Sequence, residues 1–323
     1  MLLRQYWQAL LAFTVGLLVP PFYINLQRTA LAKSGPAVIT LHPQLSFLVP
    51  AVGETKVVDV TTTGTDLWFL LHSKNGFQAI KMNSSGDVQI RVDLGPTITR
   101  INSIFAAADG RLGIMSRDHV DIYSSSGSMF QTSEIENSLG CVFLDRGLFS
   151  VTPNRLVQVP SSPASQIYTP GAPFRWPTAV FSMPQDRIGV IELGPAILHQ
   201  LDVQTGAWNT SRLTAPEIQD VSRVTPTDRS VSPPIFSVSI DNSSGDLLTA
   251  VGPFNVNEGA IILRFKSDGG LLSRFRCSLP KSPALKTQRN QDGHFVLNKI
   301  AVLQDKLVLI SYSQRTCLLY DIH

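Results

Sequence analysis

Residues 80–88 read IKMNSSGDV: a short apolar run, a Ser-Ser-Gly turn and the start of a second apolar run. The pattern returns as VDIYSSSGS at residues 120–128 and as LRFKSDGGL at residues 263–271. Glycine between two apolar runs indicates a hairpin, because tight hairpin turns need a residue that tolerates positive φ. We therefore expect strands joined by tight turns over nearly the whole chain after residue 37.

A longer unit can be placed around these turns. Its first copy is an antiparallel meander with strands predicted at residues 57–62, 67–73, 77–82 and 88–92. Further copies cover residues 101–133, 141–159, 179–208, 235–277 and 298–322. A period of about 40 residues in an all-strand chain is typical of a β-propeller. The sequence thus predicts an all-β fold, in which a single domain of residues 37–323 forms a six-bladed β-propeller of four-stranded antiparallel blades.

Two features of the repeats leave five or seven blades open. The third copy is degraded, because Ser-Ser-Pro-Ala at residues 161–164 replaces the usual glycine turn. The stretch 212–234 could hold further strands.

The sixth copy lacks its fourth strand, whereas residues 37–49 precede the first copy and carry one or two strands. We expect residues 38–41, or residues 46–49, to pair with residues 317–322, because a strand from one terminus often closes a propeller and removes an exposed edge.

The strand, Asp/Ser-Gly turn and strand of each copy resemble those of NHL-type and related six-bladed propellers. The resemblance covers residues 50–323 and concerns the fold, since such turns are common to many propellers. WD40 repeats end in a Trp-Asp dipeptide, and this dipeptide does not occur in the sequence. We therefore rank a WD40 protein below an NHL-like one.

The N-terminal segment has the features of a targeting signal. Arg4 is the only charged residue before Arg28, and the apolar residues 9–19 lie between them. A small-x-small pattern, Ala30-Leu31-Ala32, then suits signal-peptidase cleavage. We expect residues 1–32 to be a signal peptide and the mature chain to be periplasmic or extracellular. The alternative is a membrane anchor formed by residues 6–26; the membrane is a partner only in that case.

Composition limits the classes of partner and bond. The chain has 323 residues, a net charge of +3 and no Lys/Arg run, so nucleic acid is not an expected partner. We expect a monomer. The three cysteines are Cys141, Cys277 and Cys317. They are interpreted either as buried thiols in strands or as one disulfide between Cys277 and Cys317 with a free Cys141.

Departures from the repeat indicate where a partner could bind. Extra residues occur at 170–177, 212–234, 252–259 and 280–293. In a four-stranded meander all four stretches emerge on the same face, and long loops on a rigid scaffold often carry binding residues. The predicted partner-binding residues on this loop-rich face are Arg175, Trp176, Arg223, Asp228, Arg229, Asn255, Asn257, Glu258, Arg289 and His294.

Catalytic motifs are harder to find. A channel calcium site needs several oxygen ligands at the starts of the inner strands. The expected positions are Val57, Asn102, Leu139, Thr178, Phe236 and Asn298, of which Asn102 and Asn298 are good oxygen donors and none is acidic. The sequence therefore predicts no cofactor and no catalytic or metal-binding residue. We expect a non-enzymatic binding or scaffolding module for a protein, peptide or carbohydrate; the alternative is a metal-dependent hydrolase or lyase with its site in the central channel.

Overall fold

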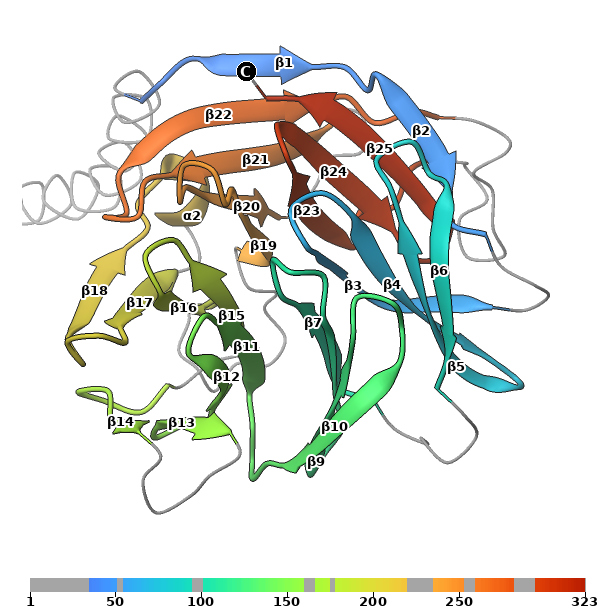
Figure 1. Cartoon of the computed structure of the whole chain (residues 1–323). Helices are drawn as coiled ribbons and strands as arrows, with labels where there is room; N and C mark the ends of the chain where they lie inside the picture. The colour runs from blue at the N-terminus through green and yellow to red at the C-terminus, as the bar shows by residue number, and fades with distance from the viewer. Residues whose placement is uncertain are drawn as a thin grey trace, which may run out of the picture.

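The computed structural model is a ring of six β-sheets around a central axis (Figure 1). It describes residues 35–50, 55–94, 101–159, 166–174, 178–219, 235–252, 259–281 and 294–322. In each sheet, strands that follow one another in the chain are antiparallel neighbours. The fold is therefore a six-bladed β-propeller, and the predicted fold class and blade number are confirmed.

The first three blades follow the repeat read from the sequence. Blade 1 consists of β3 (Lys56–Thr62), β4 (Leu67–Ser73), β5 (Gly76–Met82) and β6 (Val88–Asp93). Blade 2 consists of β7 (Ser103–Ala106), β8 (Leu112–Met115), β9 (His119–Tyr123) and β10 (Met129–Glu134). Blade 3 consists of β11 (Gly140–Leu144), β12 (Gly147–Val151), β13 (Leu156–Val159) and β14 (Ile167–Tyr168). The degraded third copy therefore keeps a fourth strand, but a short one.

The other blades complete the ring. Blade 4 consists of β15 (Thr178–Met183), β16 (Arg187–Glu192), β17 (Ile197–Asp202) and β18 (Trp208–Arg212). Blade 5 contains β19 (Ile235–Ile240), β20 (Leu247–Val251), β21 (Ala260–Phe265) and β22 (Leu271–Cys277). Blade 6 contains β23 (Lys299–Leu303), β24 (Lys306–Ser311) and β25 (Thr316–Asp321). The first strand of each blade lies innermost (Figure 1).

The N-terminal strands close the ring across two blades. Strand β2 (Leu45–Leu48) pairs antiparallel with β25, with Leu45 opposite Leu319. It supplies the missing fourth strand of blade 6. The second of the two predicted closing segments is thus confirmed. The other alternative, residues 38–41, does not pair with β25. Strand β1 (Val38–Leu41) lies parallel to β22 as a fifth strand of blade 5, because β2 already occupies the outer edge of β25.

The hydrophobic core is divided into clusters that lie between neighbouring blades. The cluster between blades 5 and 6 includes Phe275 and Tyr320, and the cluster between blades 1 and 2 is built around the fully buried Trp68. Burial of aromatic and branched side chains between the faces of twisted sheets holds one blade against the next. Each blade is therefore stabilised by its neighbours on both sides.

The three cysteines are buried free thiols. Cys277 lies in the cluster between blades 5 and 6, whereas Cys317 lies in the cluster between blades 6 and 1. The two side chains therefore point into different cores, and the alternative of a Cys277–Cys317 disulfide was wrong.

The N-terminal prediction falls outside the described residues, since residues 1–34 are not among them. In the described part of the chain, no helix has the length and apolar character that a membrane crossing requires. The stretch 212–234 holds a short helix, α2 (Pro216–Gln219), before residues 220–234, which are not described.

Candidate functional site

A cavity of about 650 Å³ lies in the centre of the ring. Its walls are the inner strands of all six blades and the turns that follow five of them. Those turns include Ala108, Asp145 and Asn242. Because an antiparallel meander reverses direction at each turn, these turns lie on the opposite side of the ring from the connections between blades. The cavity thus opens away from the predicted loop-rich face.

Aromatic side chains line the cavity on the side of blades 2, 3 and 4. Phe105, Phe143 and Phe181 come from the successive inner strands β7, β11 and β15. The ring centroids of Phe105 and Phe143 are 4.9 Å apart. The guanidinium carbon of Arg111 lies 4.9 Å from the centroid of Phe143, a cation–π geometry. Phe143 is buried beneath Arg111, whereas Phe105 and Phe181 are half-buried, so these two rings are the ones that an apolar or flat group of a ligand can reach.

Hydroxyl groups hold the opposite side of the channel together. Ser237 Oγ accepts a hydrogen bond of 3.0 Å from the backbone N–H of Ile300, and Ser239 Oγ accepts one of 3.0 Å from Val302. Thr62 Oγ1 donates to the carbonyl of Val302 at 3.3 Å. Side chains therefore satisfy backbone groups of the inner strands where blades 5, 6 and 1 meet. The polar wall of the cavity is fixed in place.

An ion pair between inner strands ties three blades together. Asp59 Oδ1 lies 2.6 Å from Lys299 Nζ of blade 6. Asp59 Oδ2 accepts a 3.0 Å hydrogen bond from the backbone N–H of Ile104 in blade 2. The hydroxyl of Tyr312 donates to Asp59 Oδ1 at 3.4 Å. Burial, followed by the nearby Asp59 charge and this hydrogen bond, raises the pKa of Tyr312, so the phenol stays a protonated donor.

Asp59 corrects the expectation that the inner-strand starts carry no acid. It stands two residues after Val57, at a β-bulge where the register of β3 against β4 shifts. The bulge gives the strand an extra residue next to Asp59, whose carboxylate contacts Lys299 of blade 6. A single acid flanked by valines was the signal in the sequence.

The two predicted oxygen donors have other partners. Asn102 Nδ2 donates to the carbonyl of Ser116 at 3.4 Å, and Asn298 Oδ1 accepts from the N–H of Tyr312 at 2.8 Å. Each asparagine thus braces the start of an inner strand within its own blade. Within the described ranges, no three His, Cys, Asp or Glu side chains gather in a way that could hold a metal ion.

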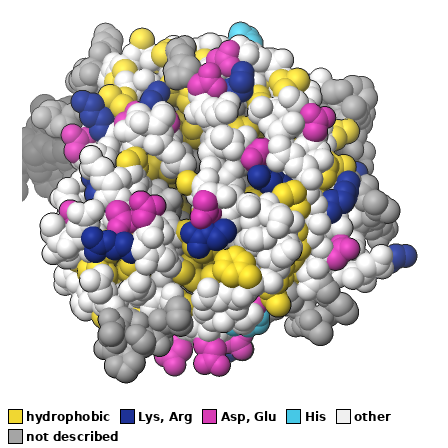
Figure 2. Space-filling view, in the orientation of Figure 1, with side chains coloured by type: hydrophobic (Ala, Val, Ile, Leu, Met, Phe, Trp, Pro, Cys, Tyr) yellow, Lys and Arg dark blue, Asp and Glu magenta, His cyan; other side chains and the backbone are white. Residues whose placement is uncertain are grey.

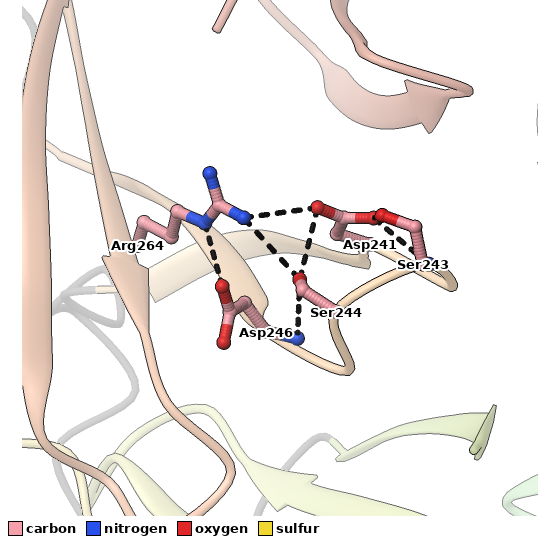
Figure 3. A network of polar contacts seen from close by, with 5 residues as sticks. All are labelled: Asp241, Ser243, Ser244, Asp246 and Arg264. Atoms are coloured by element: carbon pink, nitrogen blue, oxygen red, sulfur yellow. Dashed lines mark hydrogen bonds and ion pairs between the residues drawn. The ribbon is translucent and has the colours of Figure 1, made fainter. Parts of the chain in front are cut away.

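Paired charges surround the inner turn of blade 5 (Figure 3). Arg264 Nη2 lies 3.0 Å from Asp241 Oδ2, and Arg264 Nε lies 2.8 Å from Asp246 Oδ2. Burial would raise the pKa of Asp241, but hydrogen bonds from Ser243 and Ser244 and the Arg264 charge together lower it below its usual value. This network fixes the turn that contains Asn242, a residue of the cavity wall.

Charges of both signs are interspersed on the surface. Figure 2 shows one face, on which basic side chains lie among acidic ones and no broad area carries a single sign. Pairs on the turns next to the cavity follow the same rule: Arg146 lies 3.3 Å from Asp186, and Lys81 lies 3.1 Å from Asp66. A ligand of this cavity would therefore meet neutralised pairs rather than a strong field.

Of the ten residues predicted on the loop-rich face, His294 is the one that the structure describes. It is half-buried and forms an isolated antiparallel β-bridge with Lys281. Its backbone carbonyl accepts a 2.7 Å hydrogen bond from Gln314 Nε2. The others lie outside the described residues: Arg175, Trp176, Arg223, Asp228, Arg229, Asn255, Asn257, Glu258 and Arg289. Their convergence on one face stays a prediction.

Similar structures agree on the architecture. A virginiamycin B lyase from Staphylococcus aureus aligns with a TM-score of 0.52 and 12% identity, over 86% of this chain and 99% of that one. A streptogramin B lyase aligns at 0.51 and 11%, over 86% and 98%. The WD40 repeats of RRP9 align at 0.55 and 9%, over 89% and 100%.

The likeness is one of fold. At identities this low it carries no activity over to this chain. The predicted propeller resemblance is confirmed, but WD40 propellers align as well as the lyases do, so the ranking of NHL-like above WD40 proteins receives no support. No protein-family model matches the chain, and no curated protein matches it in sequence.

Proposed function

We propose that this chain is a non-enzymatic binding or scaffolding module, exported to the periplasm or the extracellular space. Its partner is a protein, peptide or carbohydrate. The channel cavity is the observation that carries the proposal: its volume lies in the range of ligand sites, and both apolar and polar side chains line it. Its shape is set by the inner strands and by the short turns that follow five of them.

The two walls of the cavity indicate which ligand group would enter. The phenylalanines of blades 2 to 4 suit an aromatic side chain or the apolar face of a sugar ring. Arg111, already stacked on Phe143, and Asn242 at the mouth can donate hydrogen bonds to hydroxyl or carbonyl groups. Proteins, peptides and carbohydrates all present this combination.

Two variants that replace an alanine by tryptophan test the site. Ala108 is exposed and lines the cavity mouth, whereas Ala207 is exposed on a turn of blade 4 and does not line it. Ala108→Trp should block the cavity and Ala207→Trp should not. The probes are a panel of oligosaccharides and of tripeptides with a central Trp, Tyr or Phe, measured by ligand-observed NMR.

Loss of a probe's binding in Ala108→Trp, with retention in Ala207→Trp, supports the channel site. Binding that survives both variants but is lost in the combined change Arg175→Ala, Trp176→Ala and Arg223→Ala would place the site on the predicted loop-rich face instead. A thermal shift on adding calcium, reversed by EDTA, would favour the metal-dependent enzyme over the binding module.

A further inference from the structure

Exposed apolar side chains gather on the two N-terminal strands at the outer edge of blades 5 and 6. We name residues 35–48, which contain β1 and β2, the N-terminal rim. Ten large apolar side chains are exposed in the described part of the chain, and this rim holds four of them. Their exposed fractions are 46% for Val38, 48% for Ile39, 43% for Leu45 and 67% for Leu48. Residues 35–48 also contain no Asp, Glu, Lys or Arg.

The position of the rim explains why these side chains remain exposed. Strand β1 is the outermost strand of blade 5 and β2 the outermost strand of blade 6, and both lie along the outside of the ring (Figure 1). Among the described strands, β1 is paired on one side only, with β22. An exposed apolar edge strand is a liability in water, and apolar patches of this kind mark interaction surfaces.

The sequence before the rim indicates what covers it. The rim is preceded in the sequence by the apolar residues 9–19 and by further apolar positions up to residue 26. Nine residue steps separate residue 26 from Gly35, and nine steps of extended chain span at most about 30 Å. If residues 6–26 stay in a membrane, the rim is the part of the propeller that is tied closest to it.

We propose that the chain keeps residues 6–26 as a membrane anchor, which is the alternative to their removal as a signal peptide, and that the N-terminal rim rests on the surface of the lipid bilayer. The apolar side chains Ile39 and Leu48 enter the interfacial layer. Open backbone edges do not occur in the hydrocarbon region, because their polar groups would lack partners. The one-sided pairing of β1 therefore keeps the rim at the level of the lipid headgroups.

The charged groups around the rim fit this placement. Arg276 is exposed on β22 beside Thr40, and Lys281 is exposed a few residues further on. Both can meet lipid phosphates. Asp321 lies beside the start of β2, where it accepts a hydrogen bond from Gln44 and lies 2.9 Å from Lys306 Nζ. Its charge is thus paired and opposes binding to an anionic surface little.

The first test measures depth in the membrane. The uncleaved chain, verified by intact mass, is reconstituted in liposomes, and one cysteine is introduced at Ile39→Cys or Leu48→Cys. The three native thiols are buried, so a thiol-directed fluorophore reports the introduced site. Met129→Cys on β10 of blade 2 is the matched control, because Met129 is 58% exposed.

Nitroxide lipids should quench the fluorophore at positions 39 and 48 several-fold more strongly than at position 129. A nitroxide at the headgroup should quench more than one deep in the acyl chain. Equal quenching at all three sites, no quenching at 39 and 48, or a full chain that does not associate with liposomes would overturn the proposal. Probe binding in the channel cavity does not depend on this result.

A second variant separates the rim from the anchor. Ile39→Glu with Leu48→Glu, in a chain that carries Leu45→Cys, leaves residues 6–26 unchanged. The chain should still co-sediment with liposomes, but quenching at position 45 should fall to the level of the position-129 control. Quenching that persists in the double variant would mean that the anchor alone holds the chain near the bilayer and that the rim makes no contact.

Discussion

The ring of Phe105 lies over Gly113, its cross-strand partner on β8, so closely that a Cβ at Gly113 would overlap the end of the ring. Blade 4 repeats the arrangement with Phe181 over Gly189. Each glycine thus makes room for an aromatic ring of the cavity wall. A glycine in a strand usually weakens it, and here close packing of a ring accounts for its presence.

Gly113→Ala should therefore destabilise the protein, by about 1–3 kcal/mol, because the added methyl group overpacks the site and displaces Phe105. Urea unfolding followed by fluorescence measures the change in the free energy of unfolding. Gly171→Ala is the matched control, since a Cβ there would meet no atom within 4 Å. If both variants unfold at the same urea concentration, the ring does not depend on the glycine.

The regular parts of the fold could be predicted from the sequence. Turns such as residues 84–86 recur with apolar runs on both sides, so strands, blades and their number follow from local pattern and period. The parallel pairing of β1 with β22 could not be predicted, because it links residues far apart in sequence and leaves no period. Closure by β2 was predictable because blade 6 lacked a strand.

The candidate site was less predictable. The lengths of the loops drew attention to residues such as Arg175 and Arg223. The cavity is built instead from inner strands and from short turns on the side opposite to the predicted loop-rich face. Whether an inner-strand side chain faces the channel depends on register. A bulge that shifts register by one residue, as at Asp59, is not visible in the alternation of apolar and polar residues.

Asp59→Ala should lower the free energy of unfolding by about 1–3 kcal/mol, because it leaves the N–H of Ile104 and the ammonium of Lys299 without this partner. Lys299→Met should have a smaller effect, since Asp59 keeps the hydrogen bonds from Ile104 and Tyr312. Urea unfolding of the two single variants and the double variant forms a cycle that measures the coupling. If the losses of stability in the two single variants add up to the loss in the double variant, the Asp59–Lys299 pair contributes no coupling between blades.

The thiols give a prediction for alkaline pH. Burial raises the pKa of Cys141 to about 11, from an ordinary value of 9.0. The folded state therefore favours the protonated thiol. This contribution to stability is complete below pH 9 and is lost as the pH rises from 9 to 11. Cys141→Ala should flatten that part of the stability curve, measured by urea unfolding at each pH.

Thiol counting checks the same cysteines independently. At pH 8 Ellman's reagent should react with almost no thiol in the native protein and with all three in guanidinium, without added reductant, because the three cysteines are free and buried. Release of a single thiol in guanidinium would instead mean that Cys277 and Cys317 had formed a disulfide.

Asp241 gives the corresponding prediction for acid. Its pKa is lowered in the folded state, so its contribution to stability is present above the ordinary value of 3.8 and is lost as the pH falls through the lower, folded value. Asp241→Asn should remove this loss, so that the wild-type and variant stabilities converge below pH 4. The Ser243 hydroxyl and the Arg264 guanidinium both contact Asp241 (Figure 3), and the hydroxyl lowers the pKa of Asp241 more than the Arg264 charge does. Ser243→Ala should therefore move the loss of stability at acid pH to higher pH more than Arg264→Met does. Urea unfolding from pH 3 to 7 measures both shifts. The reverse order would mean that the ion pair, and not the hydroxyls, holds the turn at the cavity mouth.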